Sequence, residues 1–295
     1  LAAWFDPLAY GTETGGSIRN PRSVTGLVGL PPTRGLLSRA GIVPLALSYD
    51  TGGPMARSVY DIAVSLGSTT GLDPLDTATA TGVGRFYRDY TVFLRTDALV
   101  GARLGVLTDY AGTDAGTKAV FSATVERLKS LGATIVEISL PEFVTKRESI
   151  STLVNSGEFK VQIAAYLATL KPGYPRTLDD LIALAAAYKP GSIGQANPSR
   201  WEVFSTEKAK GLTPDDPVYV AMNRNGRALV RDYLDALLVQ KQLDAFIYPT
   251  VPEPAQRLDR DYSTPRTPSA TSIANLTGFP DLIVPAGVTT EKLPV

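Results

Sequence analysis

The sequence predicts an α/β fold in which a mixed, partly parallel β-sheet is flanked by helices, with a helical region inserted at 148–241. The first observation behind this prediction is a strand–helix–strand pattern. An apolar run at Leu104–Leu107 is followed by an amphipathic stretch at Lys118–Leu131 and by β-branched residues at Thr134–Ile138. Strands joined through a helix at this spacing are typically parallel. The second observation is the change at 148–241 from short apolar runs to long helical stretches.

Shorter elements are expected before the strand–helix–strand unit. Pro7–Tyr10 is an apolar run typical of a buried strand, and Ser17–Gly26 is expected to form a short helix whose start is limited by Pro21. The spacing of apolar residues predicts a helix at Ala56–Leu66. Ser48–Pro54 is expected to be a loop, because two adjacent glycines and a proline there oppose a helix.

The inserted region and the end of the chain complete the predicted elements. Within 148–241 the sequence predicts helices at Ile150–Leu170, Leu178–Tyr188, Trp201–Lys210 and Val218–Gln240. After it, strands are expected at Asp244–Tyr248 and Leu282–Val284, on either side of a helix at Ser269–Leu276. Alternation of strands and helices on both sides of a helical insert again favours an α/β class.

Composition excludes several classes of function. The chain has 295 residues, of which 44% are hydrophobic and 20% charged, and its formal net charge is zero. This balance is typical of a globular protein with a substantial core and argues against disorder. A neutral chain offers no electrostatic reason to expect nucleic acid as a partner. No apolar run reaches the roughly 18–20 residues of a membrane-spanning helix, so no membrane segment is predicted.

Two absences restrict the chemistry further. The sequence contains neither cysteine nor histidine, which excludes disulfides, thiolate nucleophiles, imidazole bases and the usual zinc sites. Acid–base chemistry therefore has to come from carboxylates, lysine, tyrosine, the termini or metal-bound water. A serine nucleophile in this chain would need a lysine of lowered pKa, or a relay that ends in one.

One stretch concentrates the residues that can carry chemistry, namely Gly11-Thr12-Glu13-Thr14-Gly15-Gly16-Ser17-Ile18-Arg19-Asn20-Pro21. Its glycines allow backbone N–H groups to turn inward and a ligand to approach the main chain. Three interpretations are open from the residues alone. The stretch is a tight strand-to-helix turn, or an anion site, or an oxyanion hole beside the nucleophile Ser17. The lysine of a phosphate-binding P-loop is missing.

The surrounding sequence resembles the amidase signature family. The resemblance spans residues 11–61 in register and continues through Gly26-Leu27-Val28-Gly29-Leu30, Pro32-Thr33, Asp50 and Gly53-Pro54-Met55-Ala56-Arg57-Ser58. Weaker similarity follows at Asp244–Thr250, Gly278-Phe279-Pro280 and Val284-Pro285. Glu158-Phe159-Lys160 and the spacing of the middle region look most like the peptide amidase branch.

The resemblance implies a Ser-Ser-Lys hydrolase with the amidase signature fold, and it implies no metal and no organic cofactor. Ser17 falls on the family's nucleophile, and Thr14, Gly15, Gly16 and Ser17 fall on the loop whose backbone N–H groups form the oxyanion hole. Glu13 and Arg19 are expected to support this loop; the alternative is a surface ion pair, which contributes little.

The resemblance also implies that part of the site lies elsewhere. The family's bridging serine and its catalytic lysine precede the nucleophile, so both are expected before Leu1. We therefore interpret residues 1–295 as a single amidase signature domain that is truncated at both ends, and expect these residues in isolation to show essentially no turnover. The sequence assigns neither a compartment nor an oligomeric state.

The implied reaction converts a carboxamide into a carboxylate and ammonia. The expected partner is a small-molecule or peptide amide, with a peptide C-terminal amide as the specific candidate. One alternative is the branch of amidotransferase catalytic chains, which deamidate glutamine. Another alternative, from a different class, is a non-catalytic domain whose glycine loop binds an anion.

Overall fold

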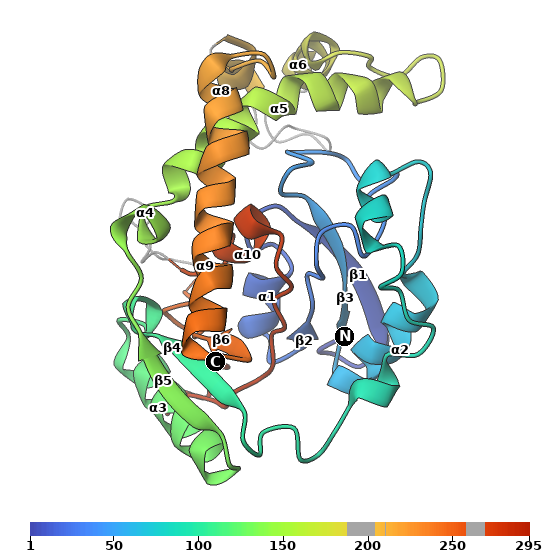
Figure 1. Ribbon diagram of the computed structural model, residues 1–295. Helices are drawn as coiled ribbons and strands as arrows, with labels where there is room; N and C mark the ends of the chain where they lie inside the picture. Colours follow the sequence, from blue (N-terminus) through green and yellow to red (C-terminus); the bar gives the residue numbers. More distant parts are fainter. Residues whose placement is uncertain (188–203, 210, 258–268) are drawn as a thin grey trace.

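A computed structural model describes residues 1–187, 204–209, 211–257 and 269–295. The part of the chain that it describes contains two three-stranded sheets and the helices around them (Figure 1). The predicted α/β class is confirmed: one sheet is antiparallel and the other is parallel. None of the described helices is long and apolar enough to cross a membrane.

The antiparallel sheet has the strand order β1-β3-β2 and carries the glycine stretch at its edge. Strand β1 (Leu8–Glu13) pairs along its whole length with β3 (Thr51–Ala56), and β2 (Val28–Gly29) pairs with the end of β3. Helix α1 (Arg19–Ser23) follows the glycine stretch, and α2 (Val59–Thr69) follows β3. The strand predicted before the glycine stretch corresponds to β1, and the two helices predicted in this part of the chain correspond to α1 and α2. The expectation of a buried strand is wrong, because β1 is only partly buried.

The expected loop at Ser48–Pro54 is wrong, because β3 is the central strand of this sheet. A Cβ atom on Gly53 would lie 2.1 Å from the carbonyl oxygen of Leu30, so only glycine allows the chains to approach. Pro54 has no N–H to donate, but its carbonyl oxygen accepts a hydrogen bond from the Leu30 N–H at 3.1 Å. Glycine and proline usually mark a turn, but in β3 they permit close strand pairing.

The parallel sheet has the order β5-β4-β6 and arises from the predicted strand–helix–strand unit. Strand β4 (Arg103–Leu107) continues through α3 (Ala115–Ser130) to β5 (Thr134–Ile138), and the two strands pair in parallel. Strand β6 (Ala245–Ile247) pairs with the other side of β4. The strand expected at Leu282–Val284 is reduced to a single bridge between Ile283 and Gly29, which links this part of the chain to β2.

The predicted helical region is confirmed over its described residues. It follows α4 (Glu142–Thr145) and contains α5 (Glu148–Ala168), α6 (Leu178–Ala187), a helix at 204–209, and α8 (Pro217–Ala221). A π-helical turn at Met222–Gly226 joins α8 to α9 (Arg227–Lys241), and the three form one long rod in Figure 1. Residue 188 of the expected second helix and residues 201–203 and 210 of the expected third helix lie outside the described residues.

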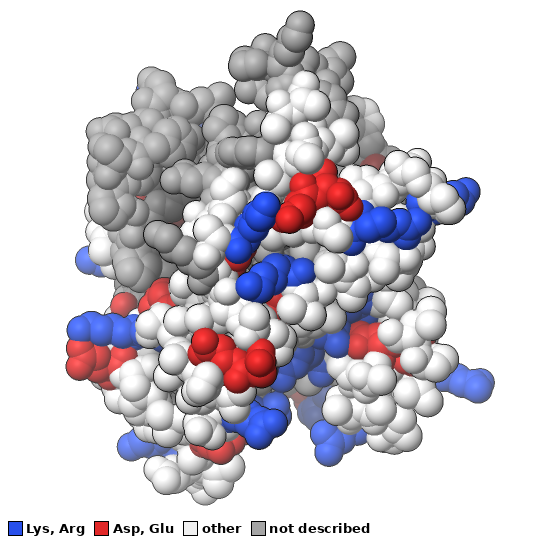
Figure 2. Space-filling view, turned by 90° about the horizontal axis from the view of Figure 1, so that it is seen from above, with Lys and Arg blue, Asp and Glu red and all other residues white. Residues whose placement is uncertain are grey.

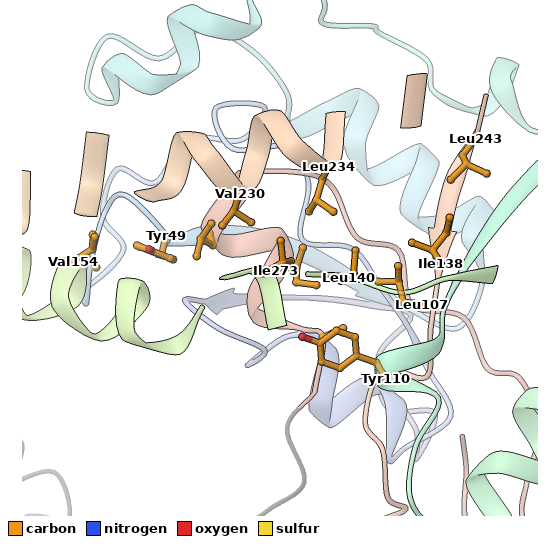
Figure 3. Close-up of a cluster of buried hydrophobic side chains, with 14 of the residues drawn as sticks. Tyr49, Leu107, Tyr110, Ile138, Leu140, Val154, Val230, Leu234, Leu243 and Ile273 are labelled. Carbon is orange, nitrogen blue, oxygen red and sulfur yellow. The ribbon is translucent and has the colours of Figure 1, made fainter. Parts of the chain in front are cut away.

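The main hydrophobic core lies between the parallel sheet and the helical region. Side chains from β4, β5, α5, α9 and α10 (Ser272–Thr277) meet there, as Figure 3 shows for Leu107, Ile138, Val154, Leu234 and Ile273. A smaller core lies under α2, around Val28, Ala56, Ile62 and Leu66. Helix α10 therefore has one side in the main core, while Thr271 just before it approaches the glycine stretch.

Candidate active site

The glycine stretch turns sharply between β1 and α1. Gly16 has a φ of +137°, which side-chain-bearing residues rarely adopt. A Cβ atom there would also lie 2.9 Å from Asn20 Nδ2 and 3.0 Å from Thr271 Oγ1. The turn continues into the helix through a hydrogen bond from the Asn20 N–H to the Gly16 carbonyl oxygen, at 2.8 Å. Gly16 is thus required by both backbone conformation and space.

Ser17 follows this turn and is exposed. Among the described residues, no hydrogen bond is made by its side chain or by the backbone N–H groups of Thr14, Gly15, Gly16 and Ser17. Backbone donors at a sharp turn next to a helix start are suited to an anion or to a developing oxyanion. The four residues predicted from the sequence are therefore brought together with donors available.

Glu13 and Arg19 form a buried pair beneath the turn, with 1% and 0% of their surfaces exposed. Glu13 Oε2 accepts hydrogen bonds from the N–H groups of Ile18 at 2.8 Å and Arg19 at 3.0 Å. Glu13 Oε1 accepts from Arg19 Nε at 2.8 Å and also from Nη2. The surface-pair alternative is wrong, because the carboxylate joins both ends of the turn inside the protein.

The Arg19 guanidinium also binds two residues from the far end of the chain. Nη1 donates to Asp281 Oδ2 at 2.5 Å, and Nη2 donates to Asn275 Oδ1 in α10. Burial alone would lower the pKa of Arg19, but the carboxylates of Asp281 and Glu13 raise it above its usual value. Tyr248 donates to Asp281, and burial together with that carboxylate raises the pKa of Tyr248 well above 10.

Asp50 holds the other side of the turn. It accepts a hydrogen bond from Thr14 Oγ1, while its Oδ2 accepts from the N–H groups of Leu45 and Ala46, both at 2.9 Å. Burial raises the pKa of Asp50, and the three donated hydrogen bonds partly oppose that shift. Asp50 is one of the residues that carry the family resemblance, and its contacts link the 45–46 segment directly to the turn.

Several neighbours of the turn had no signal in the sequence. Thr271 Oγ1 donates to the Gly15 carbonyl oxygen at 3.2 Å, although 256 residues separate the two. Asn275 and Asp281 are similarly distant from Arg19 along the chain. The surrounding residues 269–277 contain other polar side chains, so nothing local in the sequence singles out Thr271 and Asn275, and their burial is evident only in the fold.

Charge on the described part of the face seen in Figure 2 shows no single sign. Figure 2 shows Lys and Arg side chains interspersed with Asp and Glu over the described part of the face seen from above. Across the described ranges, no group of three or more Asp or Glu side chains is placed to hold a metal ion. The arrangement that stands out chemically is the exposed serine beside unpaired backbone donors.

Comparison with known proteins places the chain in a family. A family model described as Amidase matches residues 1–295. The chain belongs to the amidase family. Members of this family hydrolyse carbon–nitrogen bonds, and the amidase fold agrees with the mixed α/β architecture.

Solved amidase structures resemble the whole chain. Native peptide amidase from Stenotrophomonas maltophilia is 35% identical, with a TM-score of 0.85 over 99% of this chain and 58% of that protein. An amidase family protein from Bacillus anthracis is 28% identical, with a TM-score of 0.81 over 99% of this chain and 53% of that protein. The likeness to peptide amidase agrees with the branch predicted from the sequence.

A curated relative belongs to another branch of the family. This relative is the GatA chain of glutamyl-tRNA(Gln) amidotransferase from Pseudomonas aeruginosa, which is 33% identical over 100% of this chain and 60% of its own length. The chain thus spans between 53% and 60% of the relatives named here.

Proposed function

We propose that this amidase hydrolyses a carboxamide with Ser17 as its nucleophile. The observation that carries the proposal is the exposed Ser17 at the end of a rigid turn whose N–H groups have no partner in the described part of the chain. The serine hydroxyl adds to the amide carbon, ammonia leaves, and an acyl-enzyme forms. Water then attacks the ester, so that amide and water give carboxylate and ammonia in balance.

The backbone N–H groups of Thr14, Gly15, Gly16 and Ser17 are the oxyanion donors in this proposal. Negative charge develops on the carbonyl oxygen when Ser17 adds to the carbon, and fixed donors stabilise that charge without reorganising. Glu13 and Arg19 serve as support, because they tie the two ends of the turn together from beneath. Loss of a single oxyanion donor typically lowers kcat about 10²- to 10³-fold.

The assignment of the general base rests on the family resemblance and not on a contact in the described site. Among the described residues, no basic side chain is hydrogen-bonded to Ser17, and the chain has no histidine. The proposal assigns the base to the lysine that the resemblance places before Leu1, acting through the bridging serine. A neutral lysine can accept the serine proton and return it to the amide nitrogen, which then leaves as ammonia.

The proposed substrate is a peptide C-terminal amide. The similarity to peptide amidase, at 35% identity over almost the whole chain, supports this choice. A second candidate is glutamine deamidation in the manner of an amidotransferase GatA chain, which the 33% identity to that chain supports. A third function, anion binding without catalysis, requires only the turn and its donors.

The test uses the full-length gene product with a fluorophosphonate probe and two amide substrates. We expect covalent labelling that Ser17→Ala abolishes and that Ser130→Ala, at an exposed serine on α3, leaves intact. We also expect ammonia release from a peptide amide to exceed that from glutamine. Labelling that persists in Ser17→Ala would overturn the nucleophile assignment. Faster release from glutamine would favour the amidotransferase-like function, and no labelling or ammonia at all would favour anion binding.

A further inference from the structure

Thr271 meets the glycine turn from the far end of the chain. It lies immediately before α10, is 2% exposed, and donates from Oγ1 to the carbonyl oxygen of Gly15 at 3.2 Å. The same oxygen would lie 3.0 Å from a Cβ atom on Gly16. Thr271 therefore packs directly against the Gly15–Gly16 peptide, on the side of the carbonyl group.

That contact determines where the next N–H group points. In a planar trans peptide, the C=O of one residue and the N–H of the next point in opposite directions. Holding the Gly15 carbonyl against Thr271 therefore directs the Gly16 N–H away from Thr271. The following peptide is held in the same manner, because the Gly16 carbonyl accepts from the Asn20 N–H at 2.8 Å, which directs the Ser17 N–H.

A glycine pair needs such a contact. Glycine populates positive and negative φ with similar ease, so the peptide between Gly15 and Gly16 has little intrinsic preference against flipping. A flipped peptide would present the Gly15 carbonyl oxygen where a donor is required. The hydrogen bond from Thr271 opposes that flip because it is lost when the carbonyl turns away.

The Thr271 hydroxyl is itself held in place. Ser269 Oγ lies 2.8 Å from Thr271 Oγ1, and since Thr271 has one proton and gives it to Gly15, Ser269 is the donor between them. Arg147, which is fully buried, donates from Nη2 to the Ser269 carbonyl oxygen at 2.9 Å. Hydrogen bonds that follow one another in the same direction strengthen one another. The Ser269 and Thr271 hydroxyl groups therefore hold the Gly15 carbonyl group in place.

We propose that Thr271 is a positioning residue that locks the Gly15–Gly16 peptide with the Gly16 N–H directed at the reacting carbonyl. This inference rests on the proposed function, in which that N–H is an oxyanion donor. Thr271 acts through the backbone and does not touch the substrate. Its contribution is therefore expected in the transition state and not in ground-state binding.

The test compares Thr271→Val, which removes the hydroxyl and keeps the shape, with Thr271→Ser, which keeps the hydroxyl. In the full-length gene product we expect Thr271→Val to lower kcat about 10- to 100-fold and to change KM less than about twofold. Thr271→Ser should retain kcat within about threefold. The matched control is Thr277→Val, because Thr277 is similarly buried at the end of α10 and, among the described residues, its side chain bonds only within α10 and to Phe279 just after it.

A second measurement separates positioning from general damage. A peptide aldehyde forms a tetrahedral adduct with a serine nucleophile and places an oxyanion in the hole, whereas the neutral substrate amide carries no such charge. We expect the aldehyde to bind Thr271→Val more weakly by the same factor as kcat, with the substrate KM changed less than about twofold. Thr271→Ala serves the same comparison if the valine variant does not fold.

The possible failures are distinguishable. If kcat and aldehyde affinity are unchanged in Thr271→Val while Ser17→Ala still abolishes labelling, the positioning role of Thr271 is overturned. The proposed function would then be unaffected. An equal loss in Thr277→Val or in Thr271→Ser would also overturn the positioning role, since the effect would then be structural. Labelling that persists in Ser17→Ala would remove the proposed function itself.

Discussion

Different kinds of contact surround the two sheets of this amidase. Around the parallel sheet, strands and helices meet through a continuous apolar core, and the ion pairs Glu126–Lys129 and Glu142–Lys146 lie on exposed helix surfaces. Around the antiparallel sheet the apolar core is smaller, and the ion pairs Glu13–Arg19 and Arg39–Asp76 are buried. These ion pairs are thus exposed in one region and buried in the other.

This difference shows why the candidate site lies where it does. Apolar packing is non-directional and tolerates rearrangement, so it stabilises an element without specifying the orientation of each peptide group. Buried ion pairs and close backbone contacts at glycine are directional. A buried charge also costs free energy unless each of its polar atoms has a hydrogen-bond partner. A turn that presents N–H groups in fixed directions therefore benefits from lying in the region built from such contacts.

The largest effect is expected from breaking the buried pair with Arg19→Leu. Glu13 and Asp281 would lose their common cation, and the Glu13 carboxyl group would be left without an ionic partner inside the protein. We expect the free energy of unfolding of the full-length gene product to fall by about 3–5 kcal/mol. Urea unfolding at neutral pH measures this change. The control is Lys129→Leu on α3, where removing an exposed pair is expected to cost less than about 1 kcal/mol; equal losses in both variants would contradict the contrast between the two regions.

The second effect compares one glycine from each sheet. In Gly53→Ala the new Cβ would lie 2.1 Å from the Leu30 backbone oxygen, whereas in Gly105→Ala it would lie 2.8 Å from the Leu243 Cδ1 atom. A backbone oxygen in a strand pair cannot move without breaking the sheet, but a leucine end can change rotamer. We expect Gly53→Ala to cost more than about 3 kcal/mol and Gly105→Ala about 1 kcal/mol. Thermal unfolding of the two variants checks the order, and the reverse order would show that the antiparallel sheet yields more easily.

The same contrast explains how much of the fold could be predicted. Strands β4 and β5 and helix α3 were predictable because their apolar residues repeat at the periods of strands and helices. The sequence predicts a loop where β3 lies, because glycine and proline normally signal turns and nothing local in the sequence indicates the approach of Leu30. Hydrophobic periodicity predicts regions held by apolar packing and misses those held by close backbone contact.

The candidate site divides along similar lines. The turn from Glu13 to Arg19 could be predicted because its residues are contiguous and match a family pattern. Its partners Thr271, Asn275 and Asp281 could not, since hydrogen bonds across 256 to 262 residues leave no spacing signal. The role of Asp50 lies between these cases, because the residue was noticed but its contact with Thr14 depends on the fold.

The smallest effect concerns Asp76, and it tests the buried-charge side of the comparison through pH. Arg39 donates to both Asp76 carboxylate oxygens, and these hydrogen bonds lower the pKa of Asp76 to about 2. A carboxyl group whose pKa is lower in the folded state than its unfolded value of 3.8 stabilises the fold above that value. The stabilisation is lost as pH falls through the folded pKa.

We therefore expect Asp76→Asn to reduce the free energy of unfolding by about 1–2 kcal/mol at pH 7, after allowing for solvent screening. The difference in the free energy of unfolding between the variant and the parent should disappear as pH falls from about 5 to about 2, because Asp76 of the parent then becomes protonated and loses its charge. Urea unfolding across this range measures both curves, with Glu126→Gln on α3 as the exposed control that should follow the parent throughout. A gap that stays constant with pH would mean that Asp76 contributes by packing and neutral hydrogen bonds. The buried charges around the antiparallel sheet would then matter through shape and not through ionisation.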